Sequence, residues 1–226
     1  MLLFGDLSLQ MAIATLLAVL AGMTIHEFAH NYVGHLMGDP NPARMGKLTL
    51  NPLAHINPLG FLMFALIGFG VLGQAPVAAH RMRNPRWGYM ASVAAGPLSN
   101  LLLAVVVALL LRLTGINPYR IWMIVFSGVT TSPLETLALL LGQVVFWNVL
   151  LFVFNLLPVF PIDGWHIVLA LLPPDLAYTW QKYAQTTNYI LFGLIILSFL
   201  RIPGLNILSL IVFQPAYSIA TTLMGL

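Results

Sequence analysis

The chain carries five long stretches without a charged residue, and these limit its fold more than any other feature. The stretches cover residues 7–25, 88–111, 136–162, 183–200 and 202–226, and each is near or above the length of a membrane-spanning helix. Of 226 residues, 60% are hydrophobic and only 7% are charged, unlike the mix of a soluble domain. The sequence therefore predicts an all-α polytopic membrane protein with about five to six transmembrane helices.

One further apolar segment, from Phe61 to Gly73, is short. As a helix it would reach only about 20 Å, whereas the hydrocarbon core is ~30 Å thick. We therefore expect a re-entrant segment here. The sequence shows no internal repeat, no low-complexity tract and no removable signal peptide, so residues 1–226 are expected to form a single membrane-embedded domain.

The polar composition excludes several kinds of chemistry. Nine Lys and Arg residues and a net charge of +3 offer no basic surface for nucleic acid, whereas a lipid bilayer is the expected surrounding. The chain has no cysteine, which rules out disulfides, thiolate metal sites and cysteine nucleophiles. Histidine, aspartate and glutamate remain as metal ligands.

An H-E-x-x-H motif, His26 to His30, follows directly on the first apolar run. On a helix, positions i and i+4 share a face, so His26 and His30 can bind one metal ion while Glu27 lies beside them. We expect this helix to continue to about Met37, where Gly38-Asp39-Pro40 ends it. A lone pair of core histidines would leave the buried acid Glu27 unexplained, because an unpaired acid in lipid is costly. The motif predicts a zinc-dependent hydrolase.

A catalytic zinc usually has three protein ligands, so one more is needed. Of the other acidic residues, only one lies inside an apolar run, Asp163. Pro158 and Pro161 interrupt the helix before it, and Gly164 follows, so the backbone can turn the carboxylate sideways. The alternative role for Asp163 is as the N-cap of the next helix.

Two later motifs extend the pattern. Asn155, Pro158, Pro161 and Asp163-Gly164 form N-x-x-P-x-x-P-x-D-G, and residues 95–100 read Ala-Gly-Pro-Leu-Ser-Asn. With the H-E-x-x-H motif, this order resembles the site-2 protease family of intramembrane zinc metalloproteases, in its compact prokaryotic subgroup without PDZ or CBS domains. The resemblance covers about residues 8–172 and implies a three-helix catalytic core there, with C-terminal helices over about 183–226.

The resemblance implies an intramembrane endopeptidase that cuts within or near transmembrane segments of membrane proteins. It implies one Zn²⁺ per chain on His26, His30 and Asp163, with Glu27 as general base. Asn155 would steady the substrate carbonyl or oxyanion. Asn100 would lie behind the metal ligands.

The residues between Gly73 and Val77 depart from the family. Relatives tend to carry Gly-Trp-Ala-Lys-Pro-Val there, and this chain lacks the Trp and the Lys. In the family this segment is an extended edge that pairs with the unwound substrate.

The basic residues predict the orientation. If the segment from Phe61 to Gly73 does not cross, one side of the membrane carries five of them, Arg44, Lys47, Arg81, Arg83 and Arg86. Arg112 and Arg120 fall on the other side, and Asp163 returns to the level of the histidines. The positive-inside rule then places the site toward the cytoplasmic side of a plasma or inner membrane.

Two other functions stay open at this stage. One is a non-proteolytic membrane protein that uses the same fold to bind a metal or a substrate. The other is a membrane zincin with a distant glutamate as third ligand, for which Glu135 is the unassigned candidate. The sequence leaves a homo-oligomer open.

Overall fold

The computed structural model describes residues 8–68, 70, 73, 75–200 and 206–226, and within them the fold is helical. Three helices are long: α1 (Leu9–Leu36), α5 (Pro85–Arg112) and α7 (Pro133–Asn155). The shorter α-helices are α2 (Asn41–Arg44), α3 (Pro52–His55), α4 (Pro58–Ile67), α6 (Pro118–Ser127), α8 (Asp163–Leu171), α9 (Pro174–Lys182), α10 (Ala184–Leu200) and α11 (Gln214–Met224). A 3₁₀ turn, η1 (Ala79–Arg81), and a π-helical turn, η2 (Ser209–Phe213), complete them.

Local sequence sets where the helices begin. Four Asn-Pro dipeptides start α3, α4, α5 and α6, with the asparagine as N-cap and the proline as first helical residue. In each, the Asn Oδ1 accepts a backbone N–H of the first turn, and the proline has no N–H to leave unpaired. Ser8 and Ser132 cap α1 and α7 in the same way. These six helix starts thus each have a side-chain cap supplied by the preceding residue.

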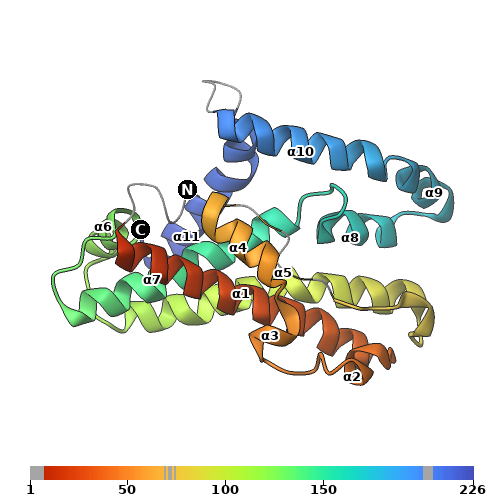
Figure 1. Ribbon diagram of the computed structural model, residues 1–226, viewed down its shortest axis with the longest axis horizontal. Coiled ribbons are helices and arrows are strands. Elements are labelled where there is room, and N and C mark those ends of the chain that lie inside the picture. Colours follow the sequence, from red (N-terminus) through yellow and green to blue (C-terminus); the bar gives the residue numbers. More distant parts are fainter. Residues whose placement is uncertain (1–7, 69, 71–72, 74, 201–205) are drawn as a thin grey trace.

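Helices α1, α5 and α7 pack against one another and form the centre of the molecule (Figure 1). The apolar core lies between α5, α6, α7 and α11, around fully buried residues such as Leu111, Val125 and Val149. Helices α8, α9 and α10 lie to one side of this bundle (Figure 1). As predicted, α1 runs through the H-E-x-x-H motif and ends at Leu36, and Gly38 follows with a φ of 110°.

The predicted count of five to six transmembrane helices is not confirmed. Among the described residues, α1, α5 and α7 are long and apolar enough to cross a membrane, and α9 with α10 would make a fourth span bent by 51°. The last apolar run forms a shorter helix over residues 209–224. The run 136–162 does not continue as one helix, because α7 ends at Asn155.

The segment expected to be re-entrant turns back on itself. Helix α4 has 10 residues, about 15 Å, which is half of the hydrocarbon thickness. Ile56, just before α4, forms an antiparallel bridge with Gly73, so the residues that flank this segment lie side by side. Residues 69, 71 and 72 lie outside the described residues.

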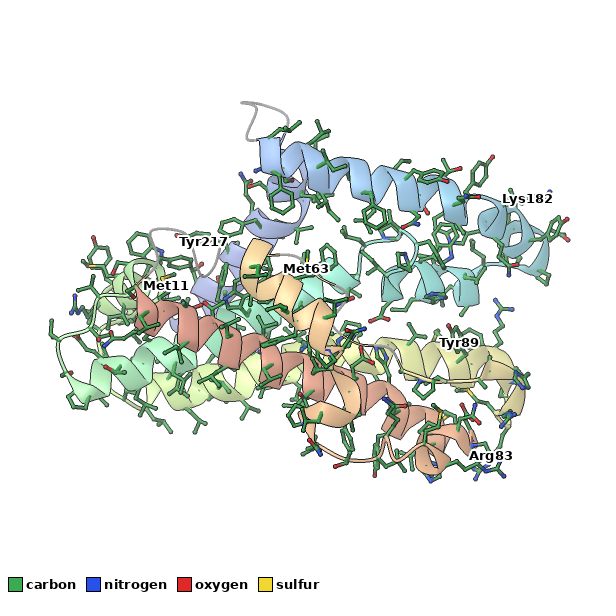
Figure 2. All side chains as sticks on the ribbon, in the orientation of Figure 1. Met11, Met63, Arg83, Tyr89, Lys182 and Tyr217 are labelled. Carbon is green, nitrogen blue, oxygen red and sulfur yellow. The ribbon has the colours of Figure 1, made fainter. Side chains whose placement is uncertain are left out.

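Basic residues lie near both ends of the bundle. Arg81 donates to Asn41 Oδ1 at 2.6 Å, and the Arg83 N–H donates to the Met37 carbonyl at 2.9 Å, so these loops meet at the end of α1. Arg112 donates to the Leu223 carbonyl, near the other end of the bundle. Figure 2 shows Met11 and Arg83 at opposite ends of it.

This arrangement can be tested with single cysteines, because the chain has none of its own. We expect Ala43→Cys and His80→Cys to react with a membrane-impermeant maleimide from one side of the membrane, and Val129→Cys from the other. All three residues are exposed: Ala43 lies in α2, His80 in η1 and Val129 in the loop after α6. Labelling of intact cells against inverted vesicles measures the side. Reaction of Ala43→Cys and His80→Cys from opposite sides would show that the segment containing α4 crosses.

Candidate metal and catalytic site

Helix α1 brings the two motif histidines together in the interior of the bundle. His26 and His30 are buried, one helical turn apart, and their Nε2 atoms are 2.9 Å apart. Their rings stand nearly perpendicular, with centroids 4.5 Å apart. Glu27 is buried on the same helix beside them. The i, i+4 spacing thus produces the face that the sequence predicted.

The broken segment after α7 delivers Asp163 to these histidines. Residues 156–162, which include Pro158 and Pro161, are not helical, and Asp163 is the first residue of α8. Its Oδ2 lies 3.1 Å from His26 Nε2 and 3.3 Å from His30 Nε2. The alternative role as a helix cap is not observed, because the N-cap position is Ile162 and no side chain caps α8.

The hydrogen bonds of the two histidine Nδ1 atoms determine what His26 Nε2, His30 Nε2 and Asp163 Oδ2 can bind together. His26 Nδ1 lies 2.7 Å from Asn100 Oδ1, and His30 Nδ1 lies 2.8 Å from the Ser92 carbonyl. Both partners are acceptors, so each Nδ1 carries the proton and each neutral ring keeps a lone pair on Nε2. Asp163 Oδ2 is buried and has no hydrogen-bond partner among the described residues. Three electron-pair donors therefore face one point, which is the donor set of a cation site.

A glycine on α5 makes room for this cluster. A Cβ at Gly96 would lie 2.3 Å from His30 Nε2 and 2.8 Å from His26 Cε1. No side chain larger than hydrogen fits there, so α5 can approach both imidazoles only at this residue. The middle motif of the sequence thus serves the site through its glycine as well as through Asn100.

The three donors, with Glu27, line a cavity of about 540 Å³. Glu27 Oε2 is buried without a partner among the described residues. A Cβ at Gly73 would lie 2.7 Å from Glu27 Oε1, so the chain after α4 passes directly beside this carboxylate. Ala75 and Val77 line the same cavity, whereas Gln74 lies outside the described residues.

Asn155, at the end of α7, also lines this cavity. Its Nδ2 donates to the Leu151 carbonyl of the same helix at 2.9 Å, which holds the amide in place. An amide nitrogen carries two hydrogens, so the second one is free to donate into the cavity. No hydrogen bond from the Asn155 side chain to another helix is observed among the described residues.

The other titratable candidates are elsewhere or otherwise engaged. Glu135 forms an ion pair with Arg120 at 2.7 Å, at the opposite end of α7 from Asn155. The alternative with Glu135 as third ligand is therefore wrong. His35 and His55 bond the carbonyls of Asp39 and Thr49 and do not join the cluster of His26, His30 and Asp163.

Three residues of the site were missed or left aside. His166 has no partner spacing in the sequence, yet it lies on α8 with its Nδ1 3.3 Å from the Tyr89 hydroxyl, and both residues line the cavity. Ser92, which holds His30, had no motif of its own. Its signal was spacing, since Ser92, Gly96 and Asn100 recur every four residues on one face of α5.

Replacing Gly96 by alanine should destroy the cluster, because the added methyl group would overlap both imidazoles. We expect loss of bound metal, measured by elemental analysis of the purified protein. Gly193→Ala is the matched control, since a Cβ on that helical glycine meets nothing within 4 Å. Full metal content in the Gly96→Ala variant would show that the histidines do not bind metal in the observed positions.

Comparison with known proteins finds no matching family model and no matching solved structure. Two bacterial proteins match by sequence. "Putative zinc metalloprotease YwhC" from Bacillus subtilis is 33% identical over 173 residues, which cover 76% of this chain and 74% of the relative. "Putative zinc metalloprotease Rip2" from Mycolicibacterium smegmatis is 33% identical over 161 residues, or 69% of this chain and 56% of that protein. The buried histidine and carboxylate cluster and these two matches agree, and the chain belongs to the zinc metalloprotease family of these relatives.

Proposed function

We propose that this protein is an intramembrane zinc endopeptidase of the site-2 protease type, which hydrolyses peptide bonds within or near transmembrane segments of other membrane proteins. One observation carries the proposal. Two imidazole nitrogens and a carboxylate oxygen lie within 3.3 Å of one another, between apolar helices long enough to cross a bilayer. A base, Glu27, lies beside them.

Zinc suits the donors His26, His30 and Asp163. Two neutral imidazoles and one carboxylate, with a fourth position open, are typical of catalytic zinc, and cysteine is absent from the chain. When bound, Zn²⁺ acidifies water and polarises a carbonyl group. We therefore assign one Zn²⁺ to each chain.

Two residues around the metal position have separate roles, one in proton transfer and one in stabilising negative charge. Glu27, whose Oε2 has no partner among the described residues, takes the proton from the attacking water and passes it to the leaving amine. Asn155 donates its free amide hydrogen to the oxygen on which negative charge develops. Its bond to the Leu151 carbonyl fixes the direction of that donation.

The substrate must present extended backbone, because a helical peptide bond has its carbonyl already bonded. Gly73 lies beside Glu27, and Ala75 and Val77 line the cavity with it, so these residues form the edge along which an unwound segment would lie. The missing Trp and Lys make this edge smaller and uncharged. The partner is thus a transmembrane protein that unwinds locally.

Water can reach the site from the side that carries the five basic residues. A second cavity of about 500 Å³, lined by Lys47, His55 and Asn57, shares Gly73 and Ala75 with the catalytic cavity. Under the positive-inside rule this side faces the cytoplasm. We therefore place the protein in a plasma or inner membrane with the site open to the cytoplasm.

Exchange of Glu27 for glutamine tests the reaction. Glu27→Gln should keep zinc and lower the cleavage rate of a transmembrane model substrate by about 10²–10⁴-fold, because glutamine cannot take up the proton. Gel-based cleavage with purified protein in detergent measures the rate, and elemental analysis measures the metal. Retained cleavage would overturn the assigned base.

The matched variant is Asp163→Ala, which should lose both zinc and cleavage because it removes one of three ligands. If wild-type protein bound zinc in full but cleaved no transmembrane substrate, the non-proteolytic alternative would stand. Zinc retained in Asp163→Ala would contradict the ligand set.

Asn155→Leu should lower kcat by about 10²–10³-fold with little change in KM, since the lost hydrogen bond forms with charge that develops in the transition state. Zinc content should stay at the wild-type level, because Asn155 is not among the ligand atoms. Steady-state kinetics on the same substrate separates kcat from KM. A rise in KM alone would place Asn155 in substrate binding instead.

A further inference from the structure

A second buried asparagine, Asn148 of α7, continues the hydrogen bonds behind His26. Its side chain is fully buried, and its Oδ1 lies 2.8 Å from Asn100 Nδ2. Asn100 Nδ2 also lies 3.1 Å from the Gly22 carbonyl of α1. Helices α1, α5 and α7 therefore meet at one amide group, next to the candidate metal position.

The donor and acceptor of each hydrogen bond in the series from Asn148 to His26 follow from the bond that Asn148 makes within its own helix. Asn148 Nδ2 donates to the Val144 carbonyl of its own helix at 2.8 Å, so Asn148 presents its oxygen to Asn100. Asn100 then uses both amide hydrogens, on Asn148 Oδ1 and on the Gly22 carbonyl. Its own oxygen must face His26, and His26 must carry its proton on Nδ1.

We propose that Asn148 is a positioning residue for the metal site: it orients the Asn100 amide and thereby fixes the tautomer of His26 that offers Nε2 to the metal. The inference rests on the proposed role of His26 as a ligand. If the Asn100 amide were turned over, its nitrogen would face His26 Nδ1, and its oxygen would face two acceptors. His26 would then be driven to carry its proton on Nε2, where a metal cannot bind.

Gly22 of α1 packs closely against the Asn148 amide. A Cβ at Gly22 would lie 2.6 Å from Asn148 Oδ1 and 3.1 Å from its Cγ. The glycine lets α1 and α7 approach closely, and the amide fills the space between them. Gly22→Ala would push the oxygen of Asn148 away from Asn100 and leave the sequence of α7 unchanged.

Gln143, five residues earlier on α7, is a matched control. It is also a buried amide, and it bonds the Thr15 hydroxyl at 3.1 Å and the Val125 carbonyl at 2.7 Å. It therefore joins helices as Asn148 does, but none of its bonds leads to a metal ligand. Loss of Gln143 should affect helix packing alone.

The test measures zinc dissociation constants of purified protein by competition with a chelator. We expect Asn148→Leu and Gly22→Ala to weaken zinc binding about 10-fold, at the low end of the 10–100-fold typical of residues behind a ligand, because the Gly22 carbonyl still holds Asn100. Gln143→Leu should leave the dissociation constant within about twofold of wild type. Thermal unfolding of all variants compares their stability.

A double-mutant cycle separates orientation from packing. In an Asn100→Asp background a carboxylate oxygen faces His26 whichever way Asn148 lies, so adding Asn148→Leu should no longer weaken zinc binding. An equal loss in both backgrounds, or an equal loss for Asn148→Leu and Gln143→Leu, would overturn the inference. Failure of the wild-type protein to bind zinc would instead count against the proposed function.

Discussion

Where apolar helices exclude water, each buried donor and acceptor must find a partner within the protein. His26, His30 and Asp163 break that rule among themselves, because their facing atoms are all acceptors. Glu27 Oε2, beside them, is also buried without a partner among the described residues. Asn100 Oδ1 and the Ser92 carbonyl accept from the Nδ1 atoms of the two histidines. The exception defines the site.

Small residues on α5 make this arrangement possible. Gly96 lets the helix reach the imidazoles, and Ser92 and Asn100, one turn before and after it, hold them from behind. Larger side chains on this face of α5 would hold α1 and α5 farther apart. The Asn100 amide would then be out of reach of His26, and the ring could turn. The close packing of α1 and α5 is therefore what keeps the candidate metal ligands in their orientation.

Much of the site could be predicted from the sequence, because its residues lie in local patterns. The i, i+4 histidines and the proline-broken segment before Asp163 need only helical geometry. The number of spans was harder to predict, because an apolar run does not show where a helix stops. Asn155 ends α7 inside such a run, and α9 and α10 meet at an angle of 51°. Tyr89, Asn148 and His166 were beyond reach, because their partners lie on other helices and follow from tertiary packing.

Asp163 and the two histidines are separated by more than half of the chain, and the bundle joins them only when α8 follows α7 into place. During synthesis, α1 is complete long before Asp163 leaves the ribosome. The half-site on α1 then holds two ligands and a base but no third donor. The candidate metal site of this metalloprotease is therefore incomplete until α8 has joined α1, so its donor set forms only late in folding.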